Sequence, residues 1–94
     1  MTSVESSLLF SPIKVGTVDL KHRVVMAPLT RHRSTQKDHI PLDIVSTYYD
    51  QRASVTGTLI ISEATLVALK AGGRDYIPGI WSDAQIEAWK KVRY

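Results

Sequence analysis

An uninterrupted apolar segment, residues 24–29 (VVMAPL), constrains the fold more than any other part of this sequence. A strand covered on one face alternates apolar and polar residues, whereas a strand buried on both faces of a parallel sheet is apolar throughout. Pro28 cannot donate a hydrogen bond to a sheet, and it is tolerated near the end of a strand. We therefore predict a buried strand over residues 24–29, with Thr30 at its carboxyl end.

A second apolar segment, residues 58–62 (TLIIS), predicts a second buried strand. Between the two segments, residues 41–53 place apolar side chains at helical spacing, and we expect Gly57 to end this helix. A strand, a helix and a strand connected in this way form a right-handed βαβ unit with parallel strands. Thr30 and Ala64 should then be neighbours at the carboxyl edge of the sheet.

The flanking regions predict smaller elements. Residues 13–15 and 18–20 alternate around a turn at Gly16, which indicates a β-hairpin. Residues 66–78 contain two adjacent glycines and are expected to form an irregular loop. Ser82 and Gln85 form a capping box, which predicts a final helix that continues to Tyr94. Residues 1–7 are small and polar, and we expect a disordered lead-in there.

Composition limits the class of protein. A chain of 94 residues, 44% hydrophobic, suffices for one small domain. It contains no cysteine, which suits a reducing compartment and excludes thiolate chemistry. Twelve Lys and Arg against nine Asp and Glu give a net charge of +3, a mild bias. With no apolar run long enough for a signal peptide or membrane span, we expect a soluble cytoplasmic protein without a membrane partner.

Three classes of site are disfavoured. The histidines His22, His32 and His39 are ten and seven residues apart in turn or loop sequence, so we expect solvated side chains and no metal site. The basic residues between Lys21 and Lys37 are divided by the predicted strand and lack interleaved aromatic residues, so we expect a solvated surface and no nucleic-acid partner. The adjacent glycines lack the further glycine of a dinucleotide or phosphate loop.

The strand ends are the better candidate site. Ligands of barrels and open α/β sheets bind at the carboxyl ends of the strands, which here are followed by Thr30 and Ala64. The alternative for Thr30 is that its hydroxyl caps the end of the strand.

Five ordered segments resemble the amino-terminal quarter of the old yellow enzyme family, the FMN-dependent NAD(P)H oxidoreductases and ene-reductases. The resemblance covers residues 9 to about 92. The segments that carry it are residues 9–16 (LFSPIKVG), 22–31 (HRVVMAPLTR), 48–53 (YYDQRA), 60–65 (IISEAT) and 78–82 (PGIWS).

This resemblance implies a (β/α)8 TIM barrel, of which residues 8–94 supply the amino-terminal hairpin and the first two βα units. It implies that FMN is the cofactor, that NAD(P)H is the reductant, and that the small-molecule substrates are enones or enals with an activated C=C bond. Residues matching Pro28, Leu29 and Thr30 line the flavin in this family, with the threonine near its O4 and N5 edge. The residue matching Ala64 contacts the ring, and no catalytic residue is assigned within these 94 residues.

The departures from the family pattern matter as well. The family's substrate-binding pair, its proton-donating tyrosine, the glutamine and arginine that hold the flavin ring, and its phosphate site would all lie beyond Tyr94. Arg74 stands where many members carry a tyrosine, and Leu42 is a poor helix cap.

A barrel of this type needs about 250 residues, so we expect an incomplete barrel that is inactive alone. The alternative is a non-catalytic module that folds only by pairing its open strand edges with a second copy or a complementary fragment.

Overall fold

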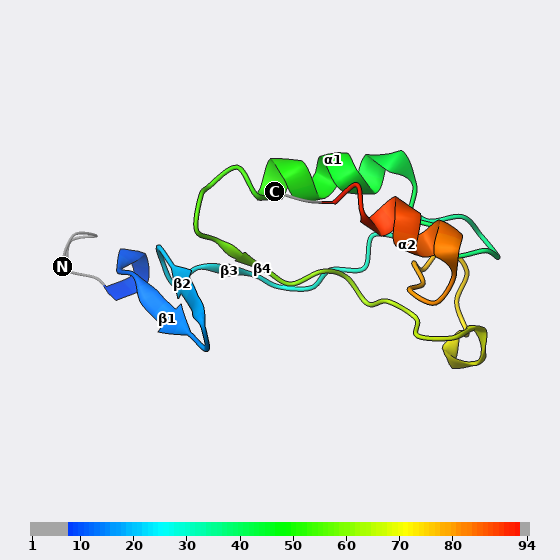
Figure 1. Cartoon of the computed structure of the whole chain (residues 1–94), viewed down its shortest axis with the longest axis horizontal. Helices are drawn as coiled ribbons and strands as arrows, with labels where there is room; N and C mark the ends of the chain where they lie inside the picture. Colours follow the sequence, from blue (N-terminus) through cyan, green and yellow to red (C-terminus); the bar gives the residue numbers. More distant parts are fainter. Residues whose placement is uncertain (1–7, 93–94) are drawn as a thin grey trace.

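The structure is a computed structural model that describes residues 8–92. The predicted lead-in over residues 1–7, and residues 93–94 of the predicted final helix, lie outside the described residues. The molecule is elongated, measuring 51 × 24 × 24 Å, with the hairpin at one end and the two helices toward the other (Figure 1). Its radius of gyration is 16.2 Å, whereas a compact domain of this length would have about 12 Å.

The amino-terminal hairpin follows the sequence prediction. A 3-10 turn, η2 (Leu8–Phe10), precedes β1 (Ile13–Val15) and β2 (Val18–Leu20). The two strands are antiparallel, and Ile13 lies opposite Leu20. Gly16 adopts a φ of +60° at the turn, a conformation that glycine reaches at little cost.

The two apolar segments form a parallel pair, as predicted, but the strands are short. β3 (Val25–Met26) pairs with β4 (Leu59–Ile60), so that Val25 lies opposite Leu59. The predicted bounds, residues 24–29 and 58–62, were too long, because each strand has only the other as its ladder partner among the described residues and Pro28 offers no N–H group. The predicted burial on both faces was also wrong, since Val25 is 42% exposed and Leu29 is 50% exposed.

The helix between these strands is α1 (Asp43–Arg52). Leu42 occupies its N-cap and makes no side-chain cap bond, as expected for a residue without a polar side chain. The helix ends at Arg52, so the prediction that Gly57 ends it was wrong. Gly57 instead turns the chain into β4 with a φ of +78°, and its carbonyl accepts a hydrogen bond from the Lys21 N–H at 3.1 Å.

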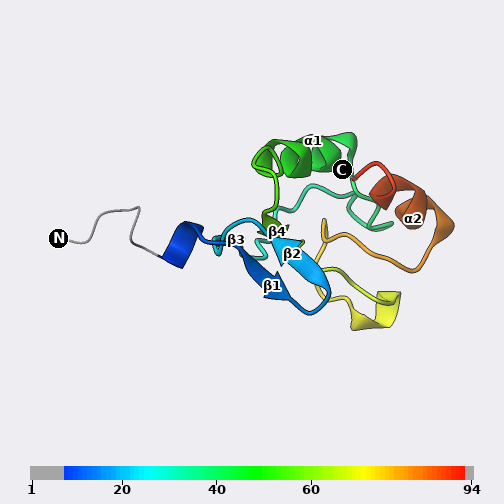
Figure 2. The same cartoon turned by 60° about the vertical axis from the view of Figure 1, so that its left-hand side comes forward.

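The predicted loop over residues 66–78 is largely irregular and contains the short turn η3 (Leu69–Ala71). Leu66 joins the far end of this loop, because its N–H donates to the Pro78 carbonyl at 2.9 Å and its carbonyl accepts from the Ile80 N–H at 3.0 Å. Figures 1 and 2 both show α1 on one side of the strand pair and η3 on the other. The segments that leave β3 and β4 therefore run between α1 and η3.

The final helix is α2 (Asp83–Trp89), and its predicted capping box between Ser82 and Gln85 is confirmed. The expectation that the helix continues to the end of the chain was wrong, because Lys90 already caps it. The segment after α2 returns to α1, where Lys91 pairs with Asp43 at 2.7 Å.

The hydrophobic core is small, and all of its side chains except Leu20 of the hairpin belong to α1 or to the loop before α2. Among the described residues, the buried hydrophobic side chains are Leu20, Val45, Tyr49 and Ile77. Gln85 is also fully buried, and its amide nitrogen donates to the Asp38 carbonyl at 2.9 Å. Polar contacts thus supply much of what joins α2 to the preceding loop.

Candidate functional site

The carboxyl ends of the two parallel strands open onto a shared groove of about 360 Å³. Thr30 and Ala64 follow β3 and β4 by the same number of residues, and both line this groove. The sequence prediction that these two residues are neighbours is therefore confirmed. The η3 side supplies the rest of the lining, namely Leu66, Ala71, Gly72, Gly73, Arg74 and Ile77.

Pro28 and Leu29 are placed differently from the other two predicted site residues. Both are exposed in the segment that follows β3, and neither is among the residues that line the groove. Leu29 is 50% exposed. The structure thus brings Thr30 and Ala64 together in the groove and leaves Pro28 and Leu29 outside its lining.

The chemistry of the groove is that of an apolar wall with two unpaired polar groups. Ala64, Leu66 and Ile77 offer carbon surface. Within residues 8–92, the Thr30 hydroxyl has no hydrogen-bond partner and the Arg74 guanidinium has no ion pair. A flat aromatic ring edged with hydrogen-bond acceptors would lie against such a wall and accept from the hydroxyl, so these residues fit one side of a flavin ring.

A buried carboxylate lies immediately behind the groove, which the sequence reasoning did not identify. Glu63, next to Ala64, is only 3% exposed, and its Oε2 accepts a hydrogen bond from the Tyr49 hydroxyl at 2.9 Å. The Tyr49 hydroxyl also accepts from the Glu63 N–H at 2.9 Å. Burial raises the pKa of the Tyr49 hydroxyl above its ordinary value of 10.0. The sequence signal that could have identified Glu63 is a charged residue directly after an apolar strand segment.

The expectation that the histidine side chains are solvated was wrong for His39 and His22. His39 is only 4% exposed, and its Nδ1 lies 2.6 Å from the Ile77 carbonyl oxygen. The Nε2 of His22 lies 2.7 Å from the Thr58 hydroxyl, so this partly buried ring joins the start of β3 to the start of β4. His32 is exposed, as predicted.

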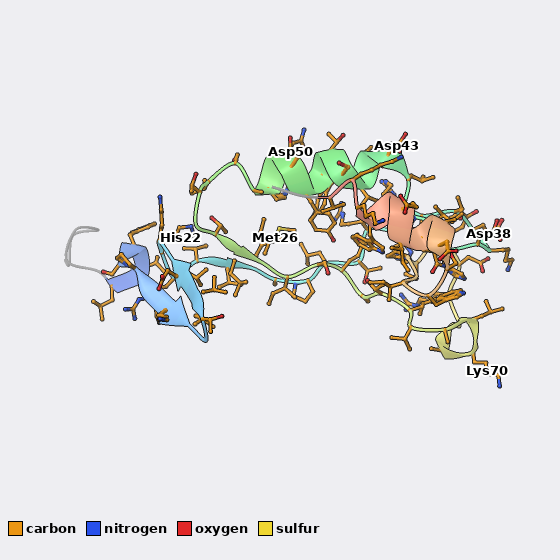
Figure 3. All side chains as sticks on the ribbon, in the orientation of Figure 1. His22, Met26, Asp38, Asp43, Asp50 and Lys70 are labelled. Atoms are coloured by element: carbon orange, nitrogen blue, oxygen red, sulfur yellow. The ribbon has the colours of Figure 1, made fainter. Side chains whose placement is uncertain are left out.

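Within residues 8–92, no group of His, Cys, Asp or Glu side chains is arranged to hold a metal ion. Figure 3 shows His22 near the hairpin and Asp38 at the opposite end of the molecule. None of the helices in this part of the chain has the length and apolar character needed to cross a membrane.

Comparison with known proteins identifies close relatives. Residues 8–93 match the model of the NADH:flavin oxidoreductase / NADH oxidase family. The chain is 57% identical over 86 residues to the NADP-dependent oxidoreductase lnbE of Aspergillus flavus, covering 92% of this chain and 22% of that protein. It is 54% identical over 84 residues to the chanoclavine-I aldehyde reductase fgaOx3 of Penicillium roqueforti, covering 89% of this chain and 22% of that protein.

A solved structure agrees with these sequence matches. The chain superposes on the Old Yellow Enzyme from Pichia sp. AKU4542 with a TM-score of 0.87 and 44% identity, covering 96% of this chain and 23% of that one. The chain therefore spans less than a quarter of the length of the relatives that it matches.

Proposed function

Because the chain belongs to the NADH:flavin oxidoreductase / NADH oxidase family, we propose that it forms the amino-terminal hairpin and first two βα units of a (β/α)8 TIM barrel in an FMN-dependent oxidoreductase. The chemistry that bound FMN supplies in this proposal is hydride transfer from NAD(P)H to the activated C=C bond of an enone or enal. The observation that carries the proposal is the shared groove of Thr30 and Ala64 at the carboxyl ends of two parallel strands.

Each groove residue has a specific role in this proposal. The unpaired Thr30 hydroxyl donates a hydrogen bond to the flavin O4, which stabilises the electron-rich reduced ring without moving a proton or a hydride. Ala64 has a small side chain and lets the ring approach the segment after β4. Pro28 and Leu29, which precede Thr30 in the chain, contact the ring beside the groove, and their exposure leaves them accessible to it.

The chain alone offers only one side of a flavin site, so we expect weak FMN binding and no turnover. The test is titration of the purified 94-residue chain with FMN, followed by flavin fluorescence, together with an assay of NADPH oxidation in the presence of 2-cyclohexenone. Ala64→Trp fills the groove and should abolish FMN binding. The control Ala84→Trp lies on the exposed surface of α2 and should leave binding intact.

Two results would count against this proposal. Equal FMN binding by the Ala64→Trp chain and the unaltered chain would exclude the groove as the flavin site. Rapid NADPH oxidation by the isolated chain with stoichiometric FMN would show that these residues suffice for catalysis, against the expectation of inactivity.

A second candidate function is that of a module that completes its fold with another chain. The observation favouring it is the small core, together with strand edges that have no ladder partner within residues 8–92. Exposed apolar side chains such as Val24, Val25 and Ile61 lie on or beside these strands. Open edges of this kind pair readily with further strands, and a complementary part of the same barrel or a second copy would supply them.

Size-exclusion chromatography with light scattering and circular dichroism tests the module hypothesis. A folded, discrete oligomer, or a stable complex with a fragment carrying later barrel strands, would support it. A folded monomer that remains monomeric when the complementary fragment is added would contradict it.

A further inference from the structure

The residues that flank the groove residues face a second pocket. Arg31 follows Thr30 and Glu63 precedes Ala64, and both line a pocket of about 190 Å³ beside α1. Successive side chains of an extended segment point to opposite sides. Each strand end therefore contributes one residue to the groove and its chain neighbour to the pocket behind it.

Four side chains connect the two strand ends across this pocket. The Arg31 guanidinium lies 5.2 Å from the centre of the Tyr48 ring, within the range of a cation–π interaction. The Tyr48 ring meets the Tyr49 ring edge-on, with centroids 5.1 Å apart and an interplanar angle of 77°. The Tyr49 hydroxyl in turn holds both the carboxylate and the N–H group of Glu63. The contacts thus run from the end of β3, through α1, to the segment after β4.

The charges in this pocket are complementary. The second carboxylate oxygen of Glu63, Oε1, is buried and has no hydrogen-bond partner within residues 8–92. Arg31 lines the same pocket and makes no ion pair with any described residue. A buried carboxylate is stable only when a cation or a donor compensates it, and Arg31 is a cation that lines the same pocket as Glu63. Arg33, the other cation of the pocket, already donates to the carbonyls of Arg31 and His32.

We propose that Arg31, Tyr48, Tyr49 and Glu63 form a positioning unit that fixes Thr30 and Ala64 relative to one another. The unit does not touch the groove. It acts through the backbone of the two strand ends, because Arg31 adjoins Thr30 and Glu63 adjoins Ala64. The energetic coupling between Arg31 and Glu63 is a property of the folded chain and does not depend on FMN. The effect of the unit on FMN binding rests on the proposed function.

A double-mutant cycle on the 94-residue chain tests the coupling. Arg31→Gln and Glu63→Gln should each raise the equilibrium constant for urea unfolding by about tenfold, and the double variant should raise it little more than either one. Arg33→Gln and Glu87→Gln are the matched controls. Glu87 is exposed and pairs only with Lys90, so its substitution should change the constant by less than about twofold.

Three results would overturn the proposed coupling between Arg31 and Glu63. The first is that the effects of the two single variants on the unfolding constant multiply in the double variant. The others are a larger coupling of Glu63 with Arg33 than with Arg31, and a chain that shows no cooperative unfolding.

A spectroscopic measurement separates positioning from general stability. With FMN added at a temperature where all variants are folded, Glu63→Gln should raise the FMN dissociation constant by about threefold to tenfold and change the visible circular dichroism of the bound flavin. Arg31→Lys, which keeps the charge, should recover most of the binding that Arg31→Gln loses. An unchanged flavin spectrum in the Glu63→Gln chain would exclude the positioning role. A chain that binds no FMN would refute the proposed function, while the unfolding cycle would still decide the coupling.

Discussion

Tyr49→Phe is expected to destabilise the chain strongly although it removes a single oxygen atom. Tyr49 is 1% exposed, and its hydroxyl is the partner of both the Glu63 N–H and the Glu63 Oε2 at 2.9 Å. Each buried group left without a partner costs about 1–3 kcal/mol, so the loss should be about 4 kcal/mol. With a urea dependence of about 2 kcal/mol per molar, the unfolding midpoint should fall by about 2 M.

The matched control for this substitution is Tyr76→Phe. Tyr76 is 45% exposed, and its hydroxyl has no hydrogen-bond partner within residues 8–92, so the control should change stability by less than about 0.5 kcal/mol. Urea unfolding followed by circular dichroism measures both variants. Equal midpoints for Tyr49→Phe and Tyr76→Phe would refute the account of the buried hydroxyl.

The same hydroxyl predicts a pH dependence in the alkaline range. Because burial raises the pKa of Tyr49 above 10.0 in the folded chain, the unfolded chain releases this proton first as the pH rises. The stabilising contribution is complete below about pH 10 and is lost as the pH rises from there toward the folded pKa, at about 1.4 kcal/mol per pH unit. Tyr49→Phe should lack this component, and a parallel alkaline loss in both chains would contradict it.

Three further substitutions test other parts of the structure. Thr30→Val in the FMN-loaded chain should lower the flavin reduction potential by about 10–30 mV, the equivalent of one hydrogen bond; spectroelectrochemistry would detect it, and an unchanged potential would exclude the hydroxyl as a donor. Gly57→Ala should destabilise by about 1–2 kcal/mol in urea unfolding, because φ is +78° and the added Cβ would lie 2.5 Å from Lys21 Cγ. Gly73→Ala, with open space around its Cβ, is the control and should be neutral or stabilising. Leu42→Ser should stabilise α1 by about 1 kcal/mol by supplying the missing cap, and the melting temperature should rise. A lower melting temperature would show that the packing lost with the Leu42 side chain outweighs the cap gained.

The sequence predicted the parallel pair and the meeting of Thr30 with Ala64, because parallel strands end at the same edge of a sheet. The sequence overestimated the length of both strands. An apolar segment indicates which residues can be buried, whereas a strand needs a hydrogen-bonded partner at each residue. Val25 has such a partner only in Leu59 and is exposed on its open side. The local capping box of Ser82 and Gln85 was predictable because both residues lie in one turn.

The features that the sequence did not predict depend on contacts between distant segments. The Tyr49–Glu63 bond joins the buried face of α1 to the residue after an apolar strand, and neither residue carries a motif. His39 was expected in solvent, but its bond to the Ile77 carbonyl closes two loops on each other. Tertiary packing decides both contacts, and the spacing of residues along the chain does not specify that packing.

The most direct test of the account is to map FMN binding onto the chain residue by residue. A 15N-labelled sample titrated with FMN should show amide shifts at Thr30, Ala64, Gly72 and Gly73, with smaller shifts at Glu63. Ala64→Trp should remove these shifts. Shifts confined to the basic residues Arg31 and Arg33, or no shifts at millimolar FMN, would contradict the claim that the groove at the carboxyl ends of β3 and β4 is one side of a flavin site.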